Sequence, residues 1–519
     1  MTSTNSPVFD NSYAKQSERF YTAQAPSSVP TPNLIRINAR LATELGIDPQ
    51  WLASPEGIAS MAGNHIPAGA EPIATVYAGH QFGGWNPQLG DGRAVLLGEL
   101  IAASGIRYDW QLKGSGRTPY SRGGDGKSPL GPVLREYILC EAMAALNVPT
   151  TRALGAVTSG ELVFRDQALP GAVFSRVAQS HIRVGTMQYF AARKDTDALQ
   201  SLSNYLIKRH FPEAAHASNP ILAMLNKIIQ RQATLIAQWQ SIGFIHGVMN
   251  TDNMLLCGET VDYGPCAFMD NYDPATVFSS IDQKGRYAYG NQPGIAHWNL
   301  AQLAQALIPI LDNSLDNSDP SISGESSREE SKNQESTGEE NAIAIAQEAL
   351  NTFPELFLSA YQNIIKDKLG VATFVEQDDE LYQNLLKLME QEKADFTLCF
   401  RRLAELANEA ACVNSSIREL FDFNDTFTPW LQQWRQRLNS DSQSPPQRQA
   451  QMFKANPVFI PRNHLVQEAI AAAEGNGDFS FFNRLVDVLE NPHTFNSENR
   501  RYAMPAKPNE KVLNTFCGT

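Results

Sequence analysis

The sequence predicts an α+β fold, with a strand-rich first part and a helix-rich second part. Two short strand-like runs, Ala94–Ile101 and Tyr108–Lys113, lie in a glycine-dense stretch between residues 77 and 131. Further along the chain, apolar residues recur at helical spacing over Ile221–Ile242 and in several later segments. Hydrophobic residues make up 42% of the 519 residues and charged residues 19%, which is enough apolar material for a large core.

The first half of the chain has one expected helix before the strands and one after them. Leu34–Leu45 is expected to form a short helix that Gly46 ends. The run Tyr108–Lys113 alternates apolar and polar residues, as a half-buried strand does. Pro132–Leu146 is expected to be helical, since proline at position 132 suits a first turn.

The second half opens with the clearest helix, Ile221–Ile242, which Gly243 follows. A short strand is expected at Phe244–His246. Two more short strands are expected at Met254–Leu256 and Thr260–Asp262, around a glycine turn. Helical patterns resume at about residues 341–365 and 379–406.

Composition divides the chain into four parts. We expect an N-terminal extension over residues 1–70, a strand-rich part over 71–170, a helical part over 171–445 and a C-terminal extension over 446–519. Residues 311–341 are rich in acidic residues and serine and nearly devoid of apolar ones, so they are predicted to be a disordered insertion.

Charge and cysteine usage exclude several classes of protein. The formal net charge is −13, which disfavours a nucleic-acid partner because phosphate binding needs a positive surface. No apolar run reaches membrane-spanning length, and the first residues lack the apolar core of a secretory signal. The six cysteines form no C-x-x-C pair, which argues against a zinc site and for a reducing compartment. We therefore expect a cytoplasmic monomer with neither a nucleic-acid nor a membrane partner.

The stretch Gly90-Asp-Gly-Arg93 leads directly into the first strand. Glycines at such a turn let backbone N–H groups approach a phosphate, and Arg93 adds positive charge. The same pair of glycines is also compatible with a plain turn.

Lys113 stands at the end of the second strand, and the next helix carries Glu136 and Glu141. A protein-kinase-like fold places a lysine on its third strand to hold nucleotide phosphates, and a helix carboxylate orients that lysine. A surface lysine near solvated carboxylates would produce the same pattern.

The stretch His246-Gly-Val-Met-Asn-Thr-Asp-Asn253 has the spacing of a kinase catalytic loop, because its histidine and its last asparagine are seven positions apart. Asp262-Tyr-Gly264 then stands where a kinase has its metal-binding D-F-G. Asn253 and Asp262 would offer oxygen ligands to a divalent cation. The alternative is a hairpin with turn-forming Asn and Asp residues.

One position departs from the kinase pattern. Val248 occupies the place of the aspartate base and cannot accept a proton, whereas the neighbouring Asp252 can. The sequence therefore leaves two alternatives, an inactive kinase or one with relocated chemistry.

Several stretches together resemble the SelO family of protein adenylyltransferases, which have a pseudokinase fold. They run from near the start to near the end of the chain: Tyr77-Ala-Gly-His-Gln-Phe-Gly83, Gln88-Leu-Gly-Asp-Gly-Arg-Ala94, Leu112-Lys-Gly-Ser-Gly-Arg-Thr-Pro-Tyr-Ser-Arg122, Gly124-Asp-Gly126, the loop ending at Asn253, and Asn456-Pro-Val-Phe-Ile-Pro-Arg-Asn-His464. The resemblance implies a two-lobed kinase-like fold that binds ATP turned around, so that AMP passes to a Ser, Thr or Tyr hydroxyl of a target protein and pyrophosphate leaves.

The resemblance also implies roles for individual residues. It implies Asp252 as the base, Asn253 and Asp262 as ligands of Mg²⁺ or Mn²⁺, and Glu136 as the partner of Lys113. The residues that it implies for ATP contact are Gly90, Gly92, Arg93, Lys113, Asp125, Gly126, Arg176, Arg183 and Asp262.

A redox role for Cys517 with Cys266 is a further expectation from the resemblance. Two alternatives to AMP transfer stay open: a phosphotransferase that holds ATP in the usual orientation, and a non-catalytic nucleotide-binding scaffold. Val248 counts against the first alternative. The retention of Lys113, Asp252, Asn253 and Asp262 counts against the second.

Overall fold

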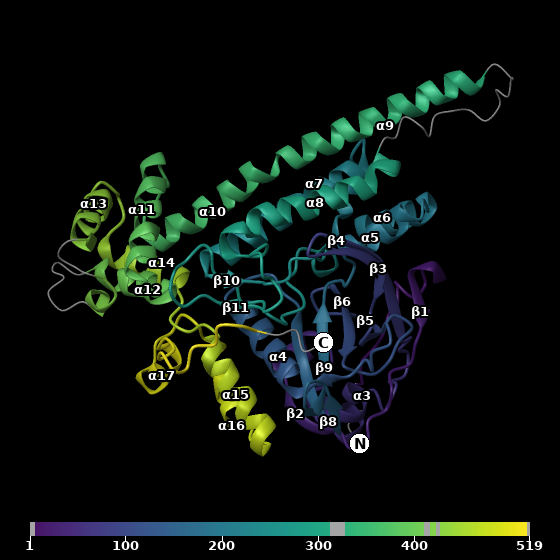
Figure 1. The fold of residues 1–519 in the computed structure, drawn as a ribbon, viewed down its shortest axis with the longest axis horizontal. Coiled ribbons are helices and arrows are strands. Elements are labelled where there is room, and N and C mark those ends of the chain that lie inside the picture. Colours follow the sequence, from purple (N-terminus) through teal and green to yellow (C-terminus); the bar gives the residue numbers. More distant parts are fainter. Residues whose placement is uncertain (1–5, 312–326, 409–415, 422–425, 516–519) are drawn as a thin grey trace.

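The computed structural model describes residues 6–311, 327–408, 416–421 and 426–515 of the chain. Its main feature is a nine-stranded antiparallel sheet in the first part of the chain (Figure 1). The strands of this sheet are β1 (Tyr21–Ala23), β2 (Asn33–Ile37), β3 (Ile73–Gln81), β4 (Gly84–Gly90), β5 (Ala94–Ile101), β6 (Arg107–Lys113), β7 (Ser128–Pro129), β8 (Arg152–Phe164) and β9 (Ala168–Ala178).

The sheet runs in the order β1-β3-β5-β6-β9-β8-β2, with β4 paired to β3 and β7 paired to β9. Strands from residues 21–37, inside the predicted N-terminal extension, therefore pair with strands at both ends of this order. The predicted strands Ala94–Ile101 and Tyr108–Lys113 are confirmed as β5 and β6, which pair directly.

Helices dominate the rest of the chain, so the α+β class is confirmed as a large antiparallel sheet followed by many helices (Figure 1). The helices are α1 (Ala39–Glu44), α2 (Pro49–Leu52), α3 (Pro55–Ala62), α4 (Leu130–Ala145), α5 (Val184–Ala192), α6 (Thr196–His210), α7 (Pro220–Ser241), α8 (Gln292–Leu311), α9 (Ser327–Asn351), α10 (Phe353–Leu369), α11 (Glu376–Glu392), α12 (Phe396–Leu406), α13 (Thr428–Asn439), α14 (Pro445–Ala455), α15 (Asn463–Asn476), α16 (Ser480–Leu489) and α17 (Arg500–Ala503). A two-stranded sheet, β10 (Phe244–Ile245) with β11 (Ala267–Phe268), follows α7.

Both faces of β6 are largely buried. Trp110 and Leu112 of β6 point into an apolar core with residues of α1 to α3, as their alternation predicts. The polar residues of the other face, Asp109, Gln111 and Lys113, are buried as well.

Helix α4 packs against β8 and β9, and α15 and α16 pack against α4 in turn (Figure 1). Helices α11 to α14 form a separate cluster far from the sheet in this view. No helix in the described part of the chain has both the length and the apolar character to span a membrane.

The predicted helices Pro132–Leu146 and Ile221–Ile242 are confirmed, each within two residues, as α4 and α7. The helix predicted over Leu34–Leu45 is wrong in its first half. Residues 33–37 instead form β2, which pairs with the distant strand β8, and Asn38 caps α1 by accepting a hydrogen bond from the backbone N–H of Leu41 (3.0 Å). Gly46 does follow the helix with a positive φ of 76°.

The strands predicted at Met254–Leu256 and Thr260–Asp262 are also wrong. Leu255 forms a single bridge with Arg183 and Thr260 a single bridge with Thr150, so the two segments do not pair with each other. The predicted disordered insertion is only partly described, because residues 312–326 lie outside the described residues. From Ser327 onward it is helical, as the first half of α9. The structure describes residues 327–341 as helix, and glutamate, a good helix former, recurs there.

Candidate active site

A cleft of about 810 Å³ brings together the residues that the sequence marked for chemistry. Its walls come from β3 to β6, β9, α4 and the loops around residues 120–127, 248–253 and 262–265. All of the predicted ATP, metal, base and lysine-orienting residues line it: Gly90, Gly92, Arg93, Lys113, Asp125, Gly126, Glu136, Arg176, Arg183, Asp252, Asn253 and Asp262.

Lys113 reaches across the cleft from the end of β6. Its Nζ lies 2.5 Å from Oε2 of Glu136 on α4 and 2.8 Å from Oδ1 of Asp262. The other helix carboxylate, Glu141, lies five residues further along α4 and accepts hydrogen bonds from Nε (2.9 Å) and Nη2 (2.8 Å) of Arg152. The helix therefore presents Glu136, and not Glu141, to the lysine.

Two buried arginines complete the ring around Asp262. Arg176, on β9, donates from Nη1 to Oδ1 of Asp262 (2.7 Å) and to Oε1 of Glu136 (3.0 Å). Arg183, directly before α5, donates from Nη1 to Oδ2 of Asp262 (2.8 Å). Burial would raise the pKa of Asp262, but the charges of Lys113, Arg176 and Arg183 outweigh it and hold the pKa well below its usual value.

Asp262 holds this position with a left-handed backbone (φ 62°). Non-glycine residues adopt that conformation at a cost and mostly where surrounding contacts impose it. Three cations within 2.8 Å of one carboxylate are such contacts.

The cleft is positive although the protein is strongly acidic. Its lining holds seven basic and five acidic side chains, a formal net charge of +2 in a chain of −13. The basic ones are Arg93, Lys113, Arg122, Lys127, Arg165, Arg176 and Arg183, and the acidic ones are Asp91, Asp125, Glu136, Asp252 and Asp262. Such a local concentration of cations suits a polyanionic ligand.

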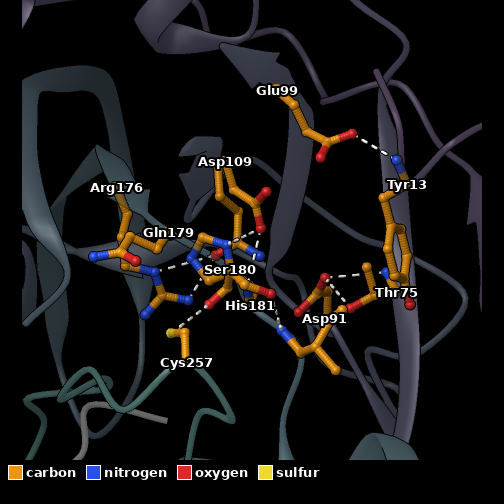
Figure 2. Close-up of polar contacts among 12 residues, drawn as sticks. Tyr13, Thr75, Asp91, Glu99, Asp109, Arg176, Gln179, Ser180, His181 and Cys257 are labelled. Atoms are coloured by element: carbon orange, nitrogen blue, oxygen red, sulfur yellow. Dashed lines mark hydrogen bonds and ion pairs between the residues drawn. The ribbon is translucent and has the colours of Figure 1, made fainter. Parts of the chain in front are cut away.

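The turn Gly90–Gly92 is held by contacts with two residues, Thr75 and Tyr120. Below it, the carboxylate of Asp91 accepts hydrogen bonds from the backbone N–H (3.0 Å) and Oγ1 (2.7 Å) of Thr75 (Figure 2). Above it lies Tyr120, whose ring would come within 2.4 Å of a Cβ at Gly90. A Cβ at Gly92 would meet the carbonyl oxygen of Tyr120 at 2.7 Å. Both positions therefore require glycine on packing grounds, and Gly90 also has a positive φ of 148°.

Asp125 and Gly126 form the opposite lip of the cleft. The carboxylate of Asp125 accepts two hydrogen bonds from Arg165 (2.9 and 3.0 Å), and this holds it close to the turn between β8 and β9. Gly126 has a positive φ of 70°, and a Cβ there would lie 2.0 Å from the carbonyl oxygen of Gly116. The backbone at Gly126 therefore packs tightly against the backbone at Gly116.

A buried polar network continues from the cleft along the same face of β6 (Figure 2). Gln111 accepts from two guanidinium nitrogens of Arg176 through its Oε1 (3.1 and 2.6 Å). Two residues back, Asp109 accepts from the backbone N–H of His181 (2.9 Å) and from Arg209 of α6 (2.7 Å). The guanidinium of Arg176 is therefore held in place, because it has a partner on β6, Gln111, as well as the carboxylates of Glu136 and Asp262 in the cleft.

The loop from His246 to Asn253 is held rigidly. His246 is fully buried, and its Nε2 lies 2.8 Å from the carbonyl oxygen of Val261. The side-chain amide of Asn253 donates to the carbonyl oxygen of Val248 (2.9 Å), which leaves its carbonyl oxygen as the remaining polar atom. Residues Thr251–Asn253 form a short 3-10 turn.

Asp252 is nearly buried, with 7% of its surface exposed, yet it lines the cleft. Its Oδ2 accepts from the amide of Gln81 (3.0 Å), while its Oδ1 has no hydrogen-bond partner within the described structure. Burial raises the pKa of Asp252 to about 6, against the opposing influence of Arg183 and Gln81. A carboxyl group with that pKa is suited to take up a proton near neutral pH.

Asn253 and Asp262 fit a divalent cation in part. Both offer oxygen atoms to the cleft. Among the described residues no group of three or more His, Cys, Asp or Glu side chains converges on one point, so no all-protein metal cage exists there. Mg²⁺ and Mn²⁺ need none when phosphate and water supply the other ligands.

A C-terminal segment contacts two segments that each contribute a residue to the cleft lining. The backbone N–H of Thr515 donates to the carbonyl oxygen of Phe278 (2.8 Å), and that of Ser280 donates to the carbonyl oxygen of Thr515 (3.1 Å). The hydroxyl of Thr515 bonds the carbonyl oxygen of Pro265, in the segment after Asp262-Tyr-Gly264. Ile281 follows and lines the cleft.

Of the predicted redox pair, Cys517 lies outside the described residues. Cys266 is fully buried next to Pro265, and its thiol contacts the carbonyl oxygen of Tyr263 (3.4 Å). The four cysteines that the structure describes are all buried and none forms a disulfide.

Sequence reasoning missed four side chains that support the site. Gln81 and Asp91 stood inside the recognised glycine-rich stretches without an assigned role, so their position next to those glycines was a usable signal. Tyr120 likewise stood inside a recognised stretch, Leu112–Arg122, without an assigned role. Arg165 gave no signal, because its contact with Asp125 depends on how β8 pairs with β9.

Comparison with known proteins adds a family to this geometry. A family profile described as protein adenylyltransferase SelO matches residues 5–490. A protein of Rhizobium leguminosarum bv. trifolii (strain WSM2304), named protein nucleotidyltransferase YdiU, is 52% identical over 511 residues, which cover 98% of this chain and 97% of the relative. Proteins of the same name from Rhodopseudomonas palustris (strain BisB5) and Rhizobium meliloti (strain 1021) are 53% and 51% identical, each over 98% of this chain and 99% of the relative.

Proposed function

Because the chain belongs to the SelO family of protein adenylyltransferases, we propose that it transfers AMP from ATP to hydroxyl groups of target proteins and releases pyrophosphate. The observation that carries the proposal is the single cleft in which Lys113, Arg176 and Arg183 surround Asp262, with Asp252 at its edge. Nucleotidyl transfer is the activity that the relatives' names state. ATP as the donor, serine, threonine or tyrosine as the acceptor, and a kinase-like two-lobed fold are our proposals.

In this proposal the positively charged residues that line the cleft bind the triphosphate of ATP. The Gly90–Gly92 turn and Arg93 line the cleft, and the positive charge of Arg93 would stabilise one end of the triphosphate. Lys113, held by Glu136, meets another phosphate. Arg176 and Arg183 would then exchange part of their contact with Asp262 for the phosphate oxygens, since a buried guanidinium needs an anionic partner.

The proposed chemistry is an in-line displacement at the α-phosphorus. The acceptor hydroxyl oxygen forms a bond to that phosphorus while the bond to the oxygen bridging the β-phosphate breaks. Pyrophosphate leaves with the electron pair, and its growing charge is stabilised by Arg176 and Arg183. The hydroxyl proton passes to the carboxylate of Asp252.

Mg²⁺ or Mn²⁺ would be held by Asn253 and Asp262. When bound, such an ion neutralises phosphate charge and polarises the phosphorus–oxygen bonds. Asp262 is suited to this role because its neighbours keep it ionised.

The far end of the cleft suits a protein acceptor. Val248, Phe82 and Ile281 are apolar residues that line the cleft together with Asp252. Ile281 is 60% exposed, which leaves apolar surface for the residues that flank the acceptor. We further propose that the protein works as a cytoplasmic monomer. The redox role of Cys517 and Cys266 stays a prediction.

Val248 argues against phosphotransfer with ATP in the usual orientation, because that reaction uses an aspartate at this position. The retained ring of charges around Asp262 argues against a scaffold that only binds nucleotide.

One experiment separates the three activities. The protein is incubated with Mg²⁺ or Mn²⁺, acceptor protein, and ATP labelled at either the α or the γ phosphate. We expect label on protein from the α position alone. Label from the γ position alone would establish a kinase, and label from neither would establish a scaffold.

Two variants then test the assigned roles. Asp252→Ala should lose transfer by about 100-fold or more and keep metal–ATP affinity, because a general base typically contributes 10²- to 10⁴-fold. Asp262→Ala should weaken metal–ATP binding as well. Transfer at the wild-type rate by Asp252→Ala would remove Asp252 from the mechanism.

A further inference from the structure

The hairpin of β3 and β4 touches the loop that carries Asp252 at three consecutive residues. Two contacts come from its backbone. The N–H of His80 donates to Oγ1 of Thr251 (2.7 Å), and the N–H of Phe82 donates to Oδ1 of Asn250 (3.0 Å). The end of β3 is therefore fixed on the residues directly before Asp252.

The third contact comes from the residue between them. Gln81 donates from its Nε2 to Oδ2 of Asp252 at 3.0 Å. Gly79 lies on the same side of β3, two residues earlier, and a Cβ there would stand 2.9 Å from Oδ1 of Asp252 and 3.1 Å from its Cβ. One carboxylate oxygen is thus held by an amide, and the other lies in the space that a missing side chain leaves.

We propose that Gln81 is a positioning residue for the transfer reaction, which holds the Asp252 carboxylate in a fixed orientation over Gly79. The proposal rests on the proposed role of Asp252 as the base. Neither Gln81 nor Gly79 touches the reacting atoms in this proposal, since both act through Asp252.

The same hairpin connects the base to the phosphate-binding turn. Strand β3 pairs with β4 from Gln81↔Gly84 at the hairpin end to Val76↔Gly90 at the turn. The two ends of one short antiparallel element therefore contact Asp252 and form the first glycine of Gly90–Gly92. This arrangement fixes the distance between Asp252 and the proposed phosphate-binding turn, and proton removal during attack requires such a fixed geometry.

A purely structural role for Gln81 is the alternative. A buried carboxylate needs a hydrogen-bond donor whether or not it reacts, and losing that donor would lower stability. The two roles differ in one respect: a positioning residue loses its effect on rate once Asp252 is gone, whereas a structural residue does not.

The test compares Gln81→Met, which keeps the size of the side chain and removes the donor, with Gln88→Met in the exposed part of the same hairpin. We expect kcat for AMP transfer from α-labelled ATP to fall about 10- to 100-fold in Gln81→Met, with KM for ATP within about twofold, because misplacing a reactive group costs up to about 10²-fold. Gln88→Met should match the wild type. Gly79→Ala should lower kcat to a similar degree, and thermal unfolding should show that each variant is folded.

The double variant Gln81→Met with Asp252→Ala should be no slower than Asp252→Ala alone. A double variant that is clearly slower, or a wild-type kcat in Gln81→Met beside an inactive Asp252→Ala, would overturn the positioning role and leave the proposed function intact. Wild-type transfer by Asp252→Ala would overturn the base and the positioning role together.

Discussion

Replacing Lys368 with methionine is expected to stabilise the protein, and the gain should be greatest at or below pH 7. Lys368 is 98% buried at the end of α10, since only 2% of its surface is exposed. Its Nζ lies 4.1 Å from the ring centre of Phe400 and 5.6 Å from that of Phe396. Within the described residues no carboxylate lies within ion-pair distance, so the aromatic faces are the main support of this buried ammonium.

Burial lowers the pKa of Lys368 from its ordinary value of 10.5 to about 7. At 1.36 kcal/mol per pKa unit, this difference corresponds to about 5 kcal/mol of destabilisation whenever the folded protein carries the proton. Methionine keeps the volume and removes this cost, but it also loses cation–π contacts worth about 1–2 kcal/mol. The expected net gain is about 3 kcal/mol.

The sign of the pH dependence follows from proton counting. Between pH 7 and 10.5 the unfolded chain holds a proton on Lys368 that the folded protein lacks, so the stability of the wild type rises with pH across this window. Below pH 7 both states are protonated and the full cost is present. The advantage of Lys368→Met should therefore be constant below pH 7 and shrink toward pH 10.

Urea or thermal unfolding of both proteins at pH 6, 7, 8 and 9.5 measures this difference. Lys387→Met, on the exposed side of α11 in the same helical cluster, is the matched control and should show no pH-dependent gain. An advantage of Lys368→Met that is as large at pH 9.5 as at pH 6 would refute the reasoning, and so would a loss of stability at every pH.

Two matched pairs test the cleft. Glu136→Gln should lower ATP affinity about 10-fold and destabilise the fold by about 3 kcal/mol, because it leaves the buried cations Lys113 and Arg176 short of an anion. Glu141→Gln on the same helix should lower stability and leave ATP affinity unchanged. Titration calorimetry with ATP measures the difference, and equal losses of ATP affinity in the two variants would contradict this prediction. Gly126→Ala should also weaken ATP binding about 10-fold, since its Cβ would strike a backbone carbonyl at 2.0 Å, whereas Gly294→Ala meets no atom within 4 Å and should bind ATP normally.

The sequence predicted the chemistry of the cleft well because its signals are local. Lys113, the loop ending at Asn253, and Asp262 sit at fixed spacings within or next to single elements, and each lines the cleft. The spacing alone offered both Glu136 and Glu141, and the resemblance implied Glu136. The structure gives the physical reason, because Glu136 faces Lys113 whereas Arg152 holds the carboxylate of Glu141.

What the sequence did not predict depends on long-range pairing. Leu34 is the clearest case: helical spacing suggested a helix, but pairing with Val157 of β8 made the segment a strand. The strands predicted around Leu255 and Thr260 were wrong for the same reason, because Leu255 bridges to Arg183 and Thr260 bridges to Thr150, both far back in the chain. The contact between Gln81 and Asp252 spans 171 residues, and no local pattern carries that information.

The contact between Thr515 and Pro265 has a consequence for biosynthesis. The two residues are separated by 250 positions, although they touch beside the cleft. A ribosome that adds about 5–20 residues per second needs roughly 10–50 s to make the intervening chain. During that time the nascent protein already contains Lys113, Asp252 and Asp262 but lacks the segment that braces the wall around Ile281. This contact beside the cleft can therefore form only after the 250 residues between Pro265 and Thr515 have been synthesised.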